Sequence, residues 1–181
     1  LDRAGLRDVG VESTQSGDHY DPQARAVRLG PENLDTNSLT AIVTAAHEVG
    51  HAIQHAQGHG PFQWRLSLVR MAQGAERLGS FLIFAMPILA LVSRSPALGA
   101  LTLAAGVDTA GLGVGVQVIT LPVEWDASFG RALPILERGG YLGPGEQRAA
   151  RRILRACALT YLAASLAGLL NFWRWLAILR R

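Results

Sequence analysis

The segment His47-Glu48-Val49-Gly50-His51 constrains the fold more than any other feature of this chain. Two histidines four residues apart lie on one face of an α-helix, with their Cβ atoms about 5–6 Å apart. The segment therefore favours a helix whose imidazoles hold one metal ion together. Glu48 follows the first histidine and is placed to reach a water on that metal. This arrangement is typical of zinc hydrolases, with two ligands and a general base on one turn of helix.

The residues around the motif predict a helix over residues 37–57. Asp35-Thr36-Asn37-Ser38 offers several N-cap residues. Apolar residues then recur at helical spacing, and Gly58 is a typical helix end. Gly50 costs the helix interior about 1 kcal/mol relative to Ala. One use for it would be the close approach of another backbone, which a buried metal centre requires.

The composition favours a single domain that contacts a membrane. The chain has 181 residues, of which 49% are hydrophobic and 17% charged, and its mean hydropathy is +0.20. All 17 basic residues are Arg, and the net charge is +3. Because these Arg residues lie beside apolar runs rather than among aromatic residues, we expect no nucleic-acid partner. We predict the single cysteine, Cys157, to be a small buried hydrophobe.

The length of the apolar segment 81–121 decides whether it is interpreted as one helix or two. One continuous helix would be about 60 Å long, twice the roughly 30 Å hydrocarbon core of a bilayer. Residues 97–121 carry a single charge, Asp108. We therefore predict two membrane helices that turn at residues 93–96. A soluble helical core remains the alternative, since apolar runs of about 12–15 residues are ambiguous.

The predicted fold is mostly α, an integral membrane helical bundle with a gluzincin-like HExxH helix and a small N-terminal β element. We expect one domain, residues 1–181, with the following parts: a β and loop region (1–35), the motif helix (37–57), a membrane hairpin (62–92 and 97–121), a charged helix (124–137) and a C-terminal membrane helix (146–179).

The motif leaves the third metal ligand open. The metzincin pattern needs Gly and His at the positions of Gln54 and Gln57, so it is excluded. His55 continues the four-residue spacing but is rotated about 80° from His47 on an ideal helix. His59 lies beyond the expected helix end. Both remain alternatives, although exposed histidines near a helix end are the simpler interpretation.

A downstream carboxylate is the better candidate for the third ligand. Glu76 is possible, but it lies beside Arg77 in a helix that runs towards the membrane. Glu124 follows the second predicted crossing, which returns the chain to the side of the histidines. An ordinary first-turn glutamate is the alternative for Glu124. We predict that His47, His51 and Glu124 bind one Zn²⁺ per chain.

Two segments together resemble a known family. Residues 47–54 (HEVGHAIQ) and 121–128 (LPVEWDAS) resemble the bacterial neutral zinc metallopeptidases of the YugP type, and residues 18–22 and 27–29 are similar to that family's N-terminal region. The resemblance covers essentially the whole chain. It implies an integral membrane zinc peptidase of the membrane gluzincin group. It also implies a further N-terminal membrane helix, so we expect this sequence to be truncated or processed.

One position departs from the pattern of the wider membrane gluzincin group. The third-ligand motif of the wider group is Glu-aromatic-x-Ala-Asp, whereas here Ser128 stands in place of the final Asp. That Asp would orient a ligand. Asp126 is an alternative for the orienting role, which stays open.

The predicted activity is hydrolysis of peptide bonds in a peptide or membrane-protein substrate, with Glu48 as general base. Arg131 is a candidate to stabilise the oxyanion, and a solvated Arg is the simpler interpretation. The edge near Ala26–Leu29 is a candidate for adding an extended peptide. Asp108, inside a predicted span, either has a role there or lies less deep than predicted.

Arginine counts predict the location. Nine Arg residues lie on the active-site side of the predicted spans and four on the other, so the positive-inside rule favours a multi-pass protein of the bacterial plasma (inner) membrane with a cytoplasmic active site. The alternative function is a non-proteolytic zinc-binding membrane adaptor or structural protein. In that case His55 or His19 would fill the fourth zinc position.

Overall fold

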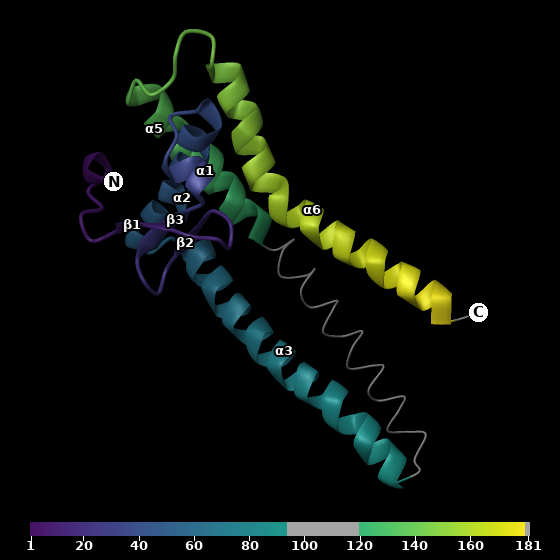
Figure 1. Cartoon of the computed structure of the whole chain (residues 1–181). Helices are drawn as coiled ribbons and strands as arrows, with labels where there is room; N and C mark the ends of the chain where they lie inside the picture. Colours follow the sequence, from purple (N-terminus) through teal and green to yellow (C-terminus); the bar gives the residue numbers. More distant parts are fainter. Residues whose placement is uncertain (94–119, 180–181) are drawn as a thin grey trace. The chain divides into compact units, whose positions relative to one another are not determined.

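A computed structural model describes residues 1–93 and 120–179 (Figure 1), with only some of the side chains described in residues 76–93 and 161–179. The chain divides into two compact units. One comprises Leu1–Gln63 and Thr120–Thr160, and the other comprises Trp64–Ile119 and Tyr161–Arg181. The first unit contains the motif.

A three-stranded sheet lies in the N-terminal part of the first unit. After a short 3₁₀ turn, η1 (Asp2–Ala4), its strands are β1 (Gly10–Ser13), β2 (His19–Asp21) and β3 (Ala26–Leu29). The order is β1-β3-β2, with β1 parallel and β2 antiparallel to β3. The predicted small β element is therefore present. However, Ala26–Leu29 is the central strand and is paired on both sides, so the prediction that it forms a free edge for a peptide is wrong.

Helix α2 (Leu39–Ala56) carries the motif and follows a short helix, α1 (Pro31–Leu34). The Ser38 hydroxyl caps α2 by accepting a hydrogen bond from the Ala41 N–H at 3.1 Å. Gly58 follows the helix with φ of 62°, a left-handed conformation that suits glycine. The observed helix thus starts two residues after the predicted start and ends one residue before the predicted end.

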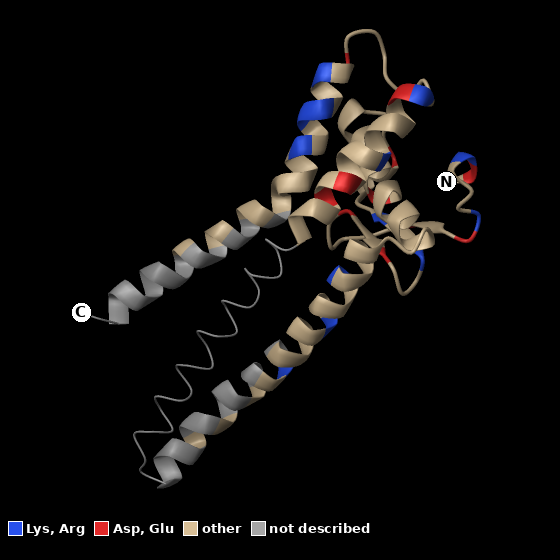
Figure 2. Cartoon of the chain, turned by 180° about the vertical axis from the view of Figure 1, so that it is seen from behind, with Lys and Arg blue, Asp and Glu red and all other residues tan. Residues whose placement is uncertain are grey.

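The segment that follows residue 119 packs on α2. Residues 120–125 are helical and continue into a π-helix, η2 (Asp126–Ala132), then into α5 (Leu133–Arg138) and α6 (Gln147–Leu179). The core between α2, η2, α5 and the start of α6 consists of small and aliphatic side chains: Val43, Ala46, Ala132, Leu133, Leu136, Ala150 and Leu154. Figure 2 shows Arg residues gathered on the N-terminal part of α6.

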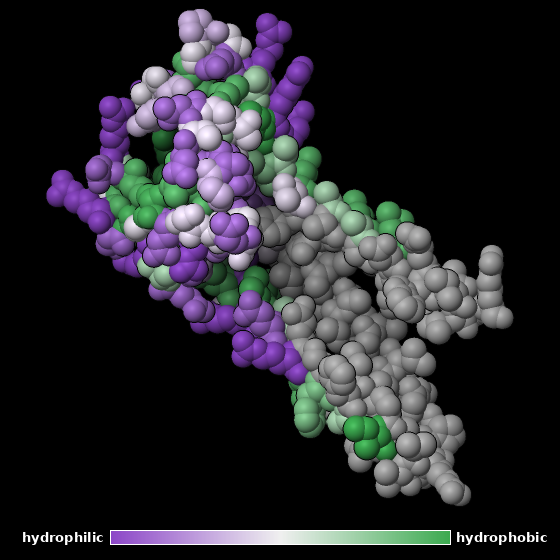
Figure 3. Space-filling model, in the orientation of Figure 1, coloured by the Kyte–Doolittle hydropathy of each residue, from purple (hydrophilic) through white to green (hydrophobic). Residues whose placement is uncertain are grey.

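Helix α3 (Gly60–Ser93) continues from the first unit into the second. Several of its described apolar side chains are more than 60% exposed: Trp64, Met71, Leu78, Phe81 and Ile88. Figure 3 shows hydrophilic side chains along the first part of this helix and patches of hydrophobic side chains farther along it. The helix matches the predicted range 62–92 closely.

The prediction of an integral membrane helical bundle is wrong for the residues that the structure describes. Among them, no helix is long and apolar enough to cross a membrane. The uncharged run Leu78–Ser93 in α3 covers 16 residues, or about 24 Å of helix against a hydrocarbon core of about 30 Å. Residues 97–119 of the predicted arm 97–121, with Asp108, lie outside the described residues. The cytoplasmic orientation relied on that arm and stays a prediction.

Candidate metal centre

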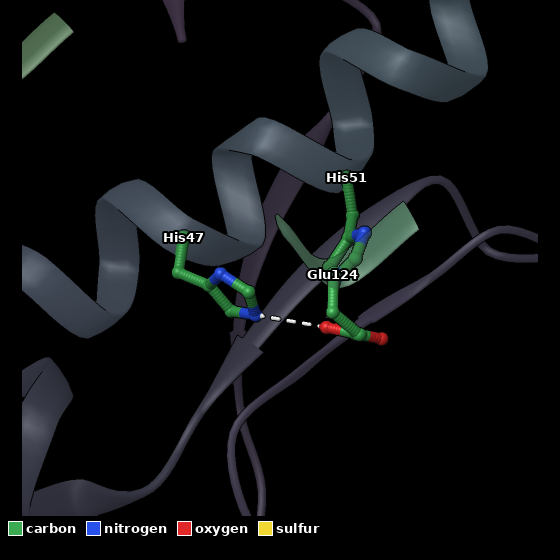
Figure 4. Close-up of side chains that lie close together, drawn as sticks. All are labelled: His47, His51 and Glu124. Carbon is green, nitrogen blue, oxygen red and sulfur yellow. Dashed lines mark hydrogen bonds and ion pairs between the residues drawn. The ribbon is translucent and has the colours of Figure 1, made fainter. Parts of the chain in front are cut away.

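Three buried side chains from two segments far apart in the sequence converge on one point. Glu124 Oε2 lies 3.3 Å from His47 Nε2 and 3.1 Å from His51 Nε2 (Figure 4). The three ligand atoms lie within 4.8 Å of one another. His47, His51 and Glu124 are 3%, 4% and 0% exposed. The structure therefore brings together the three predicted ligands.

The separations between the Glu124 oxygen and the two histidine nitrogens fit a zinc ion. Two ligands that are each about 2.0–2.1 Å from a tetrahedral zinc lie ~3.3 Å apart, close to the two separations of 3.1 and 3.3 Å observed here. Two imidazoles and one carboxylate are also a ligand set of catalytic zinc sites, in which the fourth position holds water. Within residues 1–93 and 120–179, this is the group of three or more potential ligands that is close enough for one ion.

Gly50 allows the two segments to approach. A Cβ atom at this position would lie 2.5 Å from the Ala127 carbonyl oxygen. Ala127 itself is fully buried. The backbone of η2 therefore packs directly on the glycine of the motif, as the sequence suggested, and this contact holds Glu124 beside the histidines.

Ser128 binds the outer nitrogen of the first histidine. Its Oγ lies 2.9 Å from His47 Nδ1 and donates to the Leu154 carbonyl at 3.1 Å. Ser128 is fully buried. The sequence left open whether position 128 or Asp126 orients a ligand, and Ser128 makes this contact with His47.

Gln54 binds the outer nitrogen of the second histidine. Its Oε1 lies 3.0 Å from His51 Nδ1, and its Nε2 donates to the Val123 carbonyl at 2.9 Å and to Asp126 Oδ2 at 2.8 Å. Asp126 therefore reaches the predicted ligand His51 through Gln54. Burial raises the pKa of Asp126, but hydrogen bonds from Gln54 and Arg131 outweigh it and lower the pKa below its usual value.

Sequence reasoning missed the role of Gln54. It used the residue only to exclude the metzincin pattern. The available signal was its position three residues after His51, on the same helix and near the same face. A glutamine amide at position 54 can therefore reach the imidazole of His51.

Glu48 is buried on α2, between the two histidines in sequence, and is 7% exposed. Burial raises the pKa of the Cys157 thiol to about 11, and the Glu48 carboxylate adds to this effect. Cys157 is partly buried and not reactive at neutral pH.

The alternative histidine ligands do not join the cluster. His55 Nδ1 lies 2.9 Å from the Tyr20 hydroxyl, and burial lowers the pKa of His55. His19 Nδ1 donates to the Gly17 carbonyl at 2.8 Å. Neither belongs to the group of possible ligands among the described residues, so a closed four-ligand zinc site built from them is not supported.

Two further candidates lie around Asp126. His59 Nε2 is 4.0 Å from Asp126 Oδ2. Arg131 donates from Nε to the same oxygen at 3.0 Å and also binds Gln57. Arg131 is thus held by an ion pair rather than free in solvent. The side chain of Glu76 lies outside the described part of the structure.

Comparison with known proteins identifies the family. A family model described as "Putative neutral zinc metallopeptidase" matches residues 1–180. The chain belongs to this family. It is 36% identical over 186 residues to a protein of Bacillus subtilis (strain 168) named "Putative membrane protease YugP", covering 98% of this chain and 76% of the relative. No solved structure matches the chain significantly. The resemblance seen in the sequence is confirmed.

Proposed function

We propose that this member of the neutral zinc metallopeptidase family is a zinc-dependent endopeptidase. In this proposal His47, His51 and Glu124 hold one Zn²⁺ per chain, and Glu48 is the general base. The observation that carries the proposal is the convergence of three buried ligand atoms within 4.8 Å. Family membership supports the choice of metal and reaction.

Each side chain has a defined task in this mechanism. When bound, zinc would lower the pKa of a water to about 7 and polarise the scissile carbonyl. Glu48 accepts the proton of the attacking water and passes it to the leaving amine. Burial of Glu124 and both histidines excludes bulk water around the ligands, which strengthens electrostatic interactions in the site.

We further propose that the protein acts at a bacterial membrane on peptides or membrane proteins. The Bacillus subtilis relative is named a membrane protease. The exposed apolar side chains of α3, such as Trp64 and Met71, offer a surface suited to an apolar environment. Fractionation of cells tests this: we expect the protein in the membrane pellet, and recovery in the supernatant without detergent would contradict it.

The decisive experiment measures zinc content and casein cleavage together in the wild type and in Glu48→Gln. We expect one zinc per chain in both proteins, and a rate lower by about 10²–10⁴-fold in the variant, the usual contribution of a general base. Glu137→Gln is the matched control, because Glu137 is exposed and pairs with Arg151 at 2.9 Å. Full turnover in Glu48→Gln, or no zinc in the wild type, would refute the proposed mechanism.

A further inference from the structure

Counting hydrogens at Ser128 fixes the direction of its bond to His47. Ser128 Oγ lies 3.1 Å from the Leu154 carbonyl oxygen and 2.9 Å from His47 Nδ1. A carbonyl oxygen can only accept, and a hydroxyl has one hydrogen. That hydrogen goes to Leu154, so the Ser128 oxygen accepts and His47 Nδ1 must carry the proton.

The same count applies at Gln54. Its Nε2 faces the Val123 carbonyl at 2.9 Å and the Asp126 carboxylate at 2.8 Å, and both of these groups accept only. Turning the amide over would set its oxygen against two other oxygens, so its orientation is determined by its partners. Gln54 Oε1 therefore accepts, and His51 Nδ1 must also carry a proton.

We propose that Gln54 and Ser128 are positioning residues that hold a proton on Nδ1 of both histidines and so aim both Nε2 lone pairs at Glu124 Oε2. Glu124 Oε2 then lies 3.3 Å from the unprotonated Nε2 of His47 and 3.1 Å from that of His51. A cation stabilises such a group of electron-rich atoms. The use of this geometry for zinc rests on the proposed function. The placement of the protons does not.

This assignment also explains why Ser rather than Asp stands at position 128. A carboxylate would accept from His47 Nδ1, but it has no hydrogen for the Leu154 carbonyl 3.1 Å away. Ser128 satisfies both neighbours with one atom in a fully buried position. Gln54 does the same at His51. Its oxygen accepts from His51 Nδ1, and its NH₂ group donates to the Val123 carbonyl and to Asp126.

The proton positions are measurable directly. Nitrogen-15 NMR of imidazole-labelled protein is recorded without metal at pH 9 and after saturation with Zn²⁺, with each histidine assigned by its own substitution. We expect Nδ1–H on His47 and His51 in both states. Ser128→Ala should remove this preference at His47 only, and Gln54→Met at His51 only.

Zinc affinity provides a second readout. Loss of a partner that orients a metal ligand typically lowers affinity by about 10–100-fold, and we expect a fall of this size in Ser128→Ala and in Gln54→Met. Ser128→Thr keeps the hydroxyl and should restore the Nδ1 proton at His47. Gln57→Ala is the matched control for the amide, because Gln57 binds Arg131 and no histidine.

A control for lost stability is also available on α2. Ser38→Ala removes the N-cap of the same helix and costs about 1 kcal/mol, but it should leave both tautomers and the zinc affinity unchanged. If Ser38→Ala weakens zinc binding as much as Ser128→Ala, positioning is not the cause and the proposal fails.

The wild-type spectrum alone can overturn the proposal, even if a variant does not fold. A histidine at position 47 or 51 without a proton on Nδ1 would contradict it. The outcome is separate from that of the proposed function. A protein with both Nδ1 protons that binds zinc but cleaves no casein would refute the peptidase proposal and leave the positioning roles intact.

Discussion

Helices α2 and α3 follow each other in the chain but differ in which kind of side chain they bury. Helix α2 buries polar side chains: His47, Glu48, His51 and Gln54. Helix α3 leaves large apolar side chains exposed: Trp64, Met71, Leu78, Phe81 and Ile88. In α2 the ring nitrogens of His47 and His51 contact Ser128 and Gln54, and such hydrogen bonds make the burial of polar groups tolerable. The contrast is that α2 buries polar groups that have specific partners, whereas these described apolar side chains of α3 are exposed.

The largest effect should follow from removing a buried ligand. Glu124→Ala takes away the carboxylate shared by both histidines, and we expect zinc affinity to fall by more than about 100-fold, beyond the usual loss for an outer partner. Titration with buffered Zn²⁺ measures this. The exposed Glu137→Ala should bind zinc as the wild type does. Equal affinity in both variants would mean that Glu124 is not a ligand.

A second pair of variants compares apolar side chains in the two regions. Leu136 in α5 is 1% exposed and belongs to the core beside α2, whereas Leu78 in α3 is 61% exposed. Leu136→Ala should lower the free energy of unfolding by about 2–5 kcal/mol, and Leu78→Ala by about 0.5 kcal/mol or less. Denaturant unfolding measures both. Similar losses would show that Leu78 is covered in the protein in solution.

Two glycines test backbone packing in the same way. A Cβ at Gly50 would lie 2.5 Å from a backbone oxygen, whereas one at Gly74 in α3 would meet nothing within 4 Å. Gly50→Ala should destabilise the protein by about 1–3 kcal/mol. Gly74→Ala should stabilise it by about 0.5–1 kcal/mol, because alanine favours the helix. The comparison fails if both substitutions change stability in the same direction.

The smallest effect concerns the pH dependence of stability at Cys157. Burial, and then the Glu48 carboxylate, raise its pKa to about 11, above an unfolded value of roughly 8.5. The folded state thus holds the thiol proton more tightly. Its stabilisation is fully present below pH of roughly 8.5 and is lost as pH rises towards the folded pKa.

Unfolding at pH 8 and at pH 10.5 checks this prediction. The wild type should lose more stability between the two pH values than Cys157→Ala, which has no thiol to ionise. Thiol alkylation at pH 8 should also be slow in the folded wild type and fast in denaturant. An equal pH dependence in the two proteins would contradict the raised pKa.

The ligand cluster was predictable because its signal is local. The four-residue spacing of His47 and His51 determines their shared face, and Glu124 stood out as a carboxylate in a motif with a family resemblance. The predicted membrane crossing that would return the chain to the histidines lies mostly in residues 94–119, which the structure does not describe. What the structure shows instead is η2 packed against the glycine of the motif.

The rest of the site could not be read from spacing. The π-helix adds one residue per turn over Asp126–Ala132, and apolar periodicity does not reveal such a change. The role of Ser128 depends on the Leu154 carbonyl, which lies 26 residues later in the sequence. The apolar run of α3 was interpreted as part of a membrane span, although its uncharged length is shorter than the roughly 20 residues that a span needs.

The contact between Gly50 and Ala127 restricts which substitutions the sequence can accept during evolution. The atoms that a side chain at position 50 would meet are the oxygen, carbon and Cα of Ala127, all of them backbone. Shortening the side chain at position 127 therefore removes none of them. A genetic screen for second-site suppressors of Gly50→Ala should recover no change at position 127 and only changes that shift a whole helix. A larger side chain at position 50 therefore cannot be compensated by a smaller side chain at position 127, as is common for pairs of core residues.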